Sequence, residues 1–170
     1  MRRALVPFLL SLLLIPAACA EDDGGYCGAA RDWNGDWEAY ENEVLELVNQ
    51  HRAAGANCGG EDKPPVGALT MDPALQCAAR VHSLDMVDRG YFAHDTPEGV
   101  TPWDRIESAG YDASARGENI AAGYPTPAAV VDGWMNSPGH CNNIMSGGSN
   151  EIGVGFVGDG TMWTQVFGNR

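Results

Sequence analysis

Apolar side chains recur three and four residues apart in two long segments of the chain, the spacing that predicts amphipathic helices. The first segment, DWEAYENEVLELVNQHRAAG, begins at Asp36, a residue type suited to an N-cap, and stops at Gly55. The second, MDPALQCAARVHSLDMVDRG, has Asp72 as its N-cap, Pro73 in its first turn and Gly90 at its end. Two shorter segments, VTPWDRIESAGY and TPAAVVDGWMNS, contain a Thr-Pro start and predict a third and a fourth helix.

The hydrophobic period changes from that of a helix to that of a strand near the C-terminus. Residues 151–157 and 161–167 are predicted strands on either side of a GDG turn, and together they predict a hairpin. The sequence shows no internal repeat. With helices first and a hairpin last, the pattern favours one α+β domain built in layers.

The first eighteen residues predict an export signal. Two arginines precede the apolar run ALVPFLLSLLLIP, and small residues follow it. The run is short and is soon followed by acidic residues, which argues against a membrane span. We interpret residues 1–18 as a lipoprotein-type signal peptide, with Cys19 as the lipidated residue of a cell-envelope protein. Cleavage after Ala20 is the alternative, and it would give a secreted or periplasmic protein.

Five cysteines are present, an odd number that is awkward in an oxidising compartment. If Cys19 carries lipid, four cysteines remain, enough for two disulfides in any of three pairings. We expect Cys77–Cys141, which would tie the second helix to the SPGHCNNIM segment. The second expected pair, Cys27–Cys58, would fasten the N-terminal segment to the loop after the first helix.

The exported part of the chain is strongly acidic. The formal charge of the whole chain is −13, and loss of Arg2 and Arg3 with the signal peptide makes it −15. Phosphate backbones and anionic membrane surfaces would repel such a protein, so we expect no nucleic-acid partner and membrane contact only through an N-terminal lipid. Residues 19–36 are interpreted as an acidic, glycine-bearing tether, and residues 37–170 as the globular domain.

Several motifs together carry a family resemblance. They are LELVNQHRAAG, LQCAARVHSLDM, YFAHDTPEG, RGENIAAG, VVDGWMNSPGHCNNIM and EIGVGF…MWTQVFG, in this order. Over residues 41–168 the chain resembles the bacterial branch of the CAP superfamily, which includes cysteine-rich secretory proteins, insect venom antigens and plant pathogenesis-related proteins. The resemblance implies an α+β fold, a three-layer α–β–α sandwich with a small, mainly antiparallel central sheet.

The resemblance also implies one open cleft, lined by His94, Glu118 and His140. Many family members carry a glutamate three residues after the tryptophan that precedes the second histidine, and here that position is Ser137, an accessory residue of the cleft. Two neutral imidazoles and a carboxylate are a common ligand set for zinc, with a fourth position left open. Zinc is therefore the cofactor to test at this cleft.

Other polar and aromatic residues have simpler interpretations. Glu118 could instead pair with Arg116 or accept hydrogen bonds from a turn, and Asn119 is interpreted as an amide that ties loop backbone together. His51 and His82 are interpreted as satisfied residues at helix edges. Four aromatic residues are predicted to lie in the core because such side chains dominate burial in small domains: Phe92, Trp134, Trp163 and Phe167.

Three functions remain open from the sequence. The first is a monomeric recognition module that binds an envelope or extracellular ligand, with lipid as one class. The second is a metal-dependent, protease-like hydrolase that uses the same cleft. The third is a structural envelope protein in which the cleft has no role. No catalytic residue is assigned, because neither Ser137 nor Ser83 lies in a G-x-S-x-G elbow and a cysteine in an exported chain is more simply paired.

Overall fold

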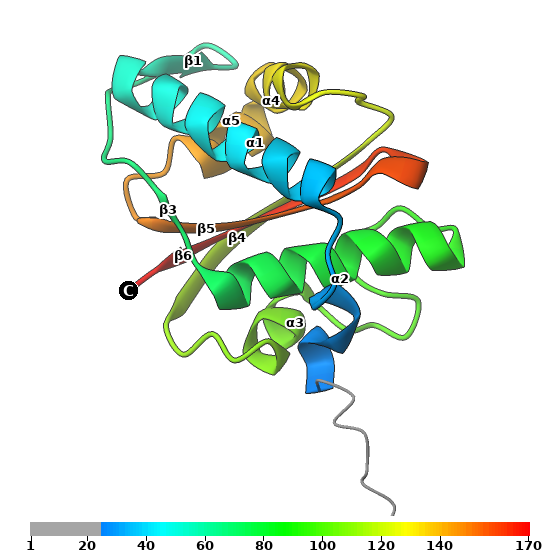
Figure 1. Cartoon of the computed structure of the whole chain (residues 1–170). Helices are drawn as coiled ribbons and strands as arrows, with labels where there is room; N and C mark the ends of the chain where they lie inside the picture. The colour runs from blue at the N-terminus through cyan, green and yellow to red at the C-terminus, as the bar shows by residue number, and fades with distance from the viewer. Residues whose placement is uncertain (1–24) are drawn as a thin grey trace, which may run out of the picture.

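The computed structural model describes residues 25–170, so the expected signal peptide and Cys19 lie outside the described residues. Helices lie on both faces of a central sheet, with α1, α4 and α5 on one face and α2 and α3 on the other (Figure 1). This three-layer α–β–α arrangement confirms the expected fold class. In chain order the elements are η1 (Gly25–Ala30), α1 (Gly35–Ala54), β1 (Ala56–Cys58), β2 (Glu61–Lys63), β3 (Thr70–Met71), α2 (Pro73–Arg89), α3 (Pro102–Ser108), β4 (Ser114–Ala122), α4 (Pro127–Met135), α5 (Pro138–Ile144), β5 (Glu151–Val157), η2 (Gly158–Gly160) and β6 (Met162–Asn169).

The two long helices begin where local hydrogen bonds satisfy their free amides. Asp72 accepts from the amides of Ala74 and Leu75 at the start of α2, as predicted, and Gly90 ends that helix in the left-handed region at φ +68°. Helix α1 starts slightly earlier than predicted, because Asn34 is its N-cap and its side chain accepts from the amide of Asp36.

The central sheet has the strand order β3-β5-β6-β4. Strands β5 and β6 form the predicted antiparallel hairpin, and β4 continues the sheet antiparallel to β6, with Glu118 opposite Val166. Only the two-residue strand β3 runs parallel to its neighbour, so the sheet is mainly antiparallel. Strand β4, which carries Glu118, was not predicted from the sequence.

Two glycines allow α2 to lie directly against the sheet. A Cβ atom at Gly153 would come within 2.0 Å of the carbonyl carbon of Leu75, and one at Gly155 within 2.3 Å of that of Ala79. Any side chain at these positions would push the helix away from β5. The close approach fixes the distance between this helix and the sheet.

The opposite face of the sheet holds most of the aromatic core. Trp134, Trp163 and Phe167 are buried, as predicted. The prediction for Phe92 is wrong, because 54% of its surface is exposed. Phe92 follows the end of α2 in a loop without regular structure, where no facing layer covers it.

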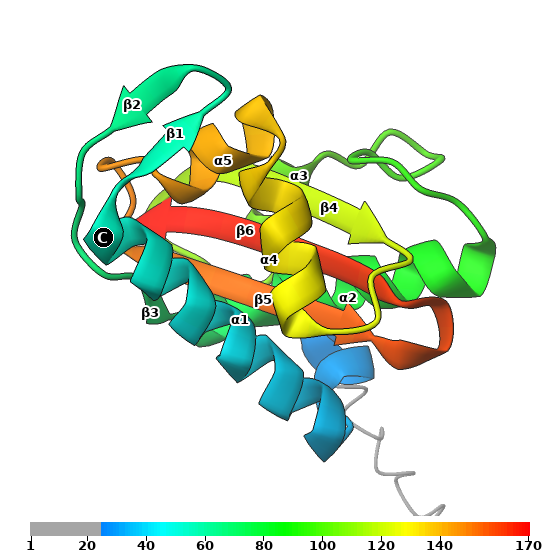
Figure 2. The same ribbon diagram turned by 90° about the horizontal axis from the view of Figure 1, so that it is seen from above.

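The disulfides are Cys27–Cys77 and Cys58–Cys141, so the pairing expected from the sequence is wrong. Cys77 lies on α2 and Cys141 on α5, and these helices cover opposite faces of the sheet (Figures 1 and 2). A disulfide needs Cα atoms within about 7 Å of each other, which the intervening sheet prevents. Instead, Cys58–Cys141 joins β1 to α5 and Cys27–Cys77 joins η1 to α2. The segment interpreted as a tether therefore includes a short helix fastened to α2.

Candidate functional site

A chain of three charged or titratable side chains forms the centre of the site. Glu118 on β4 accepts a hydrogen bond from His94 Nδ1 at its Oε1 atom (2.8 Å) and one from Arg105 Nη2 at its Oε2 atom (2.7 Å). His94 comes from the loop after α2, and Arg105 from α3. Glu118 and Arg105 are buried, whereas the side chain of His94 is 51% exposed. This chain of hydrogen-bonded side chains thus extends from the interior of the protein to its surface.

The hydrogen bond to Glu118 determines the protonation and the orientation of the His94 ring. A carboxylate paired with a guanidinium only accepts hydrogen bonds, so Nδ1 of His94 carries a proton. Because the side chain is 51% exposed, we infer that Nε2, the other ring nitrogen, is its outward nitrogen. The hydrogen bond to Glu118 raises the pKa of His94 above its ordinary value, and partial burial opposes this only in part. The outward nitrogen can accept a hydrogen bond in the neutral ring and donate one in the charged ring.

His140, on α5, belongs to the same neighbourhood. Burial lowers its pKa, and the nearby charge of His94 lowers it further, so the two imidazoles lie within electrostatic reach of each other. The backbone of His140 is held by Asn119, whose Nδ2 donates to the His140 carbonyl at 3.2 Å and to Gln165 Oε1 at 3.1 Å. Asn119 also accepts from Asn143 Nδ2 at 2.8 Å. Its amide thus ties one backbone carbonyl, as expected, but it joins strand β4 to helix α5 rather than holding a loop.

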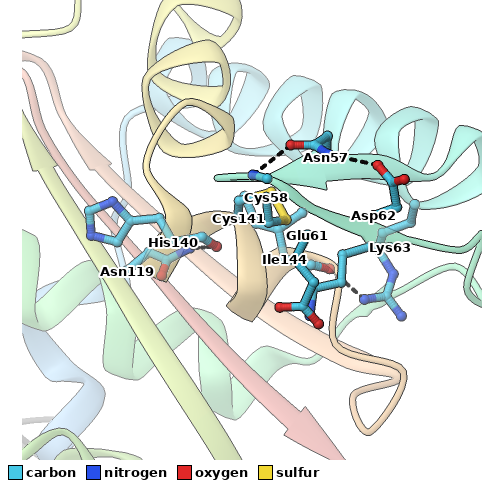
Figure 3. Close-up of a disulfide and its surroundings, with 11 residues drawn as sticks. Asn57, Cys58, Glu61, Asp62, Lys63, Asn119, His140, Cys141 and Ile144 are labelled. Atoms are coloured by element: carbon cyan, nitrogen blue, oxygen red, sulfur yellow. Dashed lines mark hydrogen bonds and ion pairs between the residues drawn. A yellow bond between two sulfur atoms is a disulfide. The ribbon is translucent and has the colours of Figure 1, made fainter.

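Helix α5 is short, and covalent and polar contacts hold it in place. Cys141, next to His140, is bonded to Cys58, and the His140 ring points away from this disulfide (Figure 3). The buried guanidinium of Arg52 donates to the carbonyls of Ile144, Ser146 and Ser149 at 2.6–3.0 Å. These contacts fix the end of α5 and the turn that follows, and thereby the position of His140.

A groove of about 310 Å³ opens beside His140. Ser137 and His140 contribute its polar groups, and Trp134 forms part of its buried wall. Phe92 and Tyr124 also line it, and 54% and 37% of their surfaces remain exposed. The groove therefore combines hydrogen-bonding groups with uncovered aromatic surface.

The residues present do not fit a zinc site. Within residues 25–170, no three His, Cys, Asp or Glu side chains gather closely enough to hold a metal ion. Both oxygens of Glu118 are engaged, one by His94 and one by the cation of Arg105. Ser137 supplies a neutral hydroxyl where many family members have a carboxylate. Structural and catalytic zinc ions usually have at least three protein ligands, and only two imidazoles remain here.

Two sequence interpretations need correction. His82 does not lie at an edge: it is fully buried, with Nε2 3.0 Å from the Ala93 carbonyl and Nδ1 without a partner among residues 25–170. The cation that pairs with Glu118 is Arg105 rather than Arg116. Arg105 was not predicted, since a single arginine in a short acidic helix gives no sign of a carboxylate that lies across the fold. His51 is half-buried near the end of α1.

Comparison with known proteins agrees with this architecture. The sequence model of the cysteine-rich secretory protein family, CAP, matches residues 45–167. The chain belongs to the CAP family. This domain carries the His94–Glu118 pair, His140 and the groove, all within the matched residues.

Two proteins of Bacillus subtilis (strain 168) are related to this CAP domain. YkwD is 42% identical over 129 residues, which cover 76% of this chain and 47% of YkwD. The membrane protein YlbC is 32% identical over 130 residues, which cover 76% of this chain and 34% of YlbC. The chain thus spans less than half the length of either relative.

Solved structures of similar fold include exported proteins. An extracellular SCP-domain protein of Bacillus anthracis str. Ames has a TM-score of 0.70 and 28% identity, over 81% of this chain and 44% of its own. An outer surface protein of Borrelia burgdorferi shares the fold, with a TM-score of 0.60 and 23% identity over 79% of this chain and 92% of its own. These neighbours are extracellular or surface proteins. Within residues 25–170, none of the helices has the length and apolar character needed to cross a membrane.

Proposed function

We propose that this CAP domain is a recognition module of the cell envelope, and that the groove beside His140 binds its ligand. The observation that carries the proposal is the combination of exposed Phe92 and Tyr124 with the polar groups of Ser137 and His140 around one open groove. Exposed aromatic residues that line a concave surface are typical of binding sites. Amphipathic molecules, lipids among them, would match an apolar wall next to polar groups.

Arg105, Glu118 and His94 lie outside the lining of the groove, but the charge of His94 acts on His140, which is part of that lining. Buried Glu118, itself held by Arg105, orients the imidazole, so less conformational freedom remains to be lost when a ligand contacts the ring. Because the pKa of His94 is raised, its ring is charged to a higher pH than an ordinary histidine. The His94 ring can then donate to an acceptor group on the ligand, while His140, with its lowered pKa, stays neutral.

The structure gives the metal-dependent hydrolase less support. That mechanism requires a carboxylate free to act as a base or a ligand. Here Glu118 is bonded on both oxygens, and a buried guanidinium neutralises its charge. Cys141 is also unavailable as a nucleophile, because it is bonded to Cys58. Recognition is therefore the function that the described residues favour.

Anchoring through lipid on Cys19 forms part of the proposal. It would hold the domain at the membrane surface despite an acidic charge that repels anionic lipids. The intact mass of the protein purified from its own envelope tests this directly. We expect an acylated N-terminal cysteine, and a free N-terminus at Glu21 would show release by ordinary cleavage instead.

Native mass spectrometry of the full exported chain tests recognition. We compare the wild type, a double variant Phe92→Ala/Tyr124→Ala that strips the groove of aromatic surface, and Trp103→Ala. Trp103 is a matched control, because it is exposed but lies outside the lining of the groove. We expect a non-covalent adduct on the wild type and on Trp103→Ala, at least tenfold depleted in the double variant. Equal adduct on all three proteins, or none on any of them, would contradict a ligand in this groove.

A further inference from the structure

A second cavity lies behind the His94–Glu118 pair, on the α2 side of the sheet. Its volume is about 370 Å³, and residues from η1, α2, the 96–100 loop and α3 line it. The lining residues include two polar ones, Tyr26 and His82, and two apolar ones, Val81 and Val100. Arg105 lines the cavity as well and donates to Glu118, so this residue connects the two sites.

Two of the residues that line the cavity each carry a polar atom that is buried and, within the described residues, unpaired. Among residues 25–170, neither Tyr26 Oη nor His82 Nδ1 has a hydrogen-bond partner. His82 is fully buried, so solvent does not satisfy its nitrogen. Buried polar groups in native proteins nearly always have a partner, and an unpaired one costs free energy. Two residues that line the same cavity thus each carry a buried polar atom without a partner in the described part of the chain, and a molecule bound there would supply both partners.

The hydrogen-bonding roles of these atoms follow from their surroundings. Nε2 of His82 lies 3.0 Å from the Ala93 carbonyl, an acceptor, so Nε2 carries the proton and Nδ1 is left with a free lone pair. Burial lowers the pKa of His82 to about 4, which keeps the ring neutral at ordinary pH. Burial raises the pKa of Tyr26 to about 12, which keeps its hydroxyl protonated. The cavity thus offers one acceptor and one donor.

Charges around the cavity are already balanced against one another. Arg105 pairs with Glu118 at 2.7 Å, and Arg89 pairs with Asp85 and Glu98. Two guanidinium groups and two carboxylates line the cavity, and a third carboxylate, that of Glu118, pairs with Arg105 outside the lining. The slight excess of negative charge would repel an anionic ligand. A cationic ligand would have no unpaired carboxylate to bind, because each one already pairs with an arginine.

We propose that this cavity binds a small neutral molecule that carries an amide or hydroxyl group on an apolar body. The polar group accepts a hydrogen bond from Tyr26 and donates one to His82 Nδ1, and the apolar body lies against Val81 and Val100. The site depends on the Cys27–Cys77 disulfide, because this bond fastens η1, and with it Tyr26, to α2. It is separate from the groove beside His140 and does not depend on the function proposed for that groove.

Four probes of similar size and different polar groups test the proposed chemistry: benzamide, benzoate, benzylamine and toluene. Each is titrated into the full exported chain labelled with ¹³C and ¹⁵N, with the ring nitrogens of His82 and the methyl groups of Val81 and Val100 as reporters. We expect saturable shifts with benzamide, and binding at least tenfold weaker with the other three. The Nδ1 resonance of His82 should move most, because it gains a hydrogen bond.

Variants separate this cavity from other sites. Tyr26→Phe removes one hydroxyl and keeps the ring, so the fold is preserved, and we expect benzamide affinity to fall at least tenfold. Tyr124→Phe removes a hydroxyl in the other groove and serves as the matched control, with no change expected. Absence of saturable shifts, affinity unchanged in Tyr26→Phe, or binding of a charged probe as tight as that of benzamide would each overturn the proposal.

Discussion

The disulfide between Cys58 and Cys141 stabilises both the fold and the position of His140, and its removal gives a quantitative prediction. The two cysteines are 83 residues apart in sequence. Closure of a loop of this length in the unfolded chain contributes about 4.5 kcal/mol at 25 °C in the entropy model, and measured values usually fall between about 2 and 4 kcal/mol. We therefore expect Cys58→Ala/Cys141→Ala to lower the free energy of unfolding by about 3 kcal/mol.

Urea denaturation at 25 °C measures this loss. With a denaturant slope of about 1.5 kcal/mol per molar, the transition midpoint should fall by about 2 M. Cys27→Ala/Cys77→Ala is the matched control, because its loop of 50 residues should give a loss only about 0.5 kcal/mol smaller. Hydrogen exchange distinguishes the two variants, since only the loss of Cys58–Cys141 should reduce the protection of amides in α5.

Thiol counting tests the pairing itself. The Cys58→Ala/Cys141→Ala variant should expose no thiol beyond those of the parent, because Cys27 and Cys77 stay bonded to each other. Two additional thiols would support the pairing that the sequence analysis expected. An unchanged midpoint would refute the stability argument, since it would mean that this bond does not constrain the unfolded chain.

Three further predictions concern packing, pH and metal. Gly155→Ala should destabilise the fold by about 3 kcal/mol in urea denaturation, because its Cβ would overlap α2. Gly139→Ala is the control, and with open space around this helical position it should be neutral or stabilising by up to about 1 kcal/mol. Equal effects of the two variants would contradict the close packing of α2 on β5. The pKa of His82 falls from 6.5 in the unfolded chain to about 4 in the fold. Between these two pH values the unfolded state binds one more proton than the folded state, so acid favours unfolding. About 3 kcal/mol of stability should therefore be lost as the pH falls from about 6.5 to about 4. His82→Leu should lack this part of the pH dependence in urea midpoints, and an identical pH profile would refute it. Calorimetric titration with zinc chloride at pH 7 should show no saturable heat, and heat that disappears in His94→Gln/His140→Gln would reveal a site that the geometry argues against.

Local patterns in the sequence predicted the elements that depend on neighbouring residues. The caps of α2 and the hairpin of β5 and β6 are encoded in this way, and each appeared close to where it was expected. Helix α1 starts slightly earlier, because Asn34 and Asp36 are both suitable N-caps and only the folded backbone selects between them. Strand β4 was missed because the stretch around Glu118 is paired with β6, a partner more than forty residues away.

Contacts between distant segments explain the remaining differences. Four cysteines carry no information about which faces of the sheet they occupy, so the pairing could not be deduced. The polar environment of Glu118 depends on Arg105, and the burial of His82 depends on how the loop after α2 folds back over it. Tyr26 lies in a stretch whose composition is that of a tether, yet the disulfide of Cys27 makes it part of a cavity wall.

The central claim is that the hydrogen-bonded pair of His94 and Glu118 lies within electrostatic reach of His140, which lines the groove, and titration of the histidine ring nitrogens by NMR tests it most directly. In the wild type, the pKa of His94 should lie above that of an ordinary histidine and the pKa of His140 below it. Glu118→Gln should lower the pKa of His94, and His94→Gln should raise that of His140 because a nearby positive charge is removed. If the pKa of His140 is the same with and without His94, the two imidazoles do not share a site.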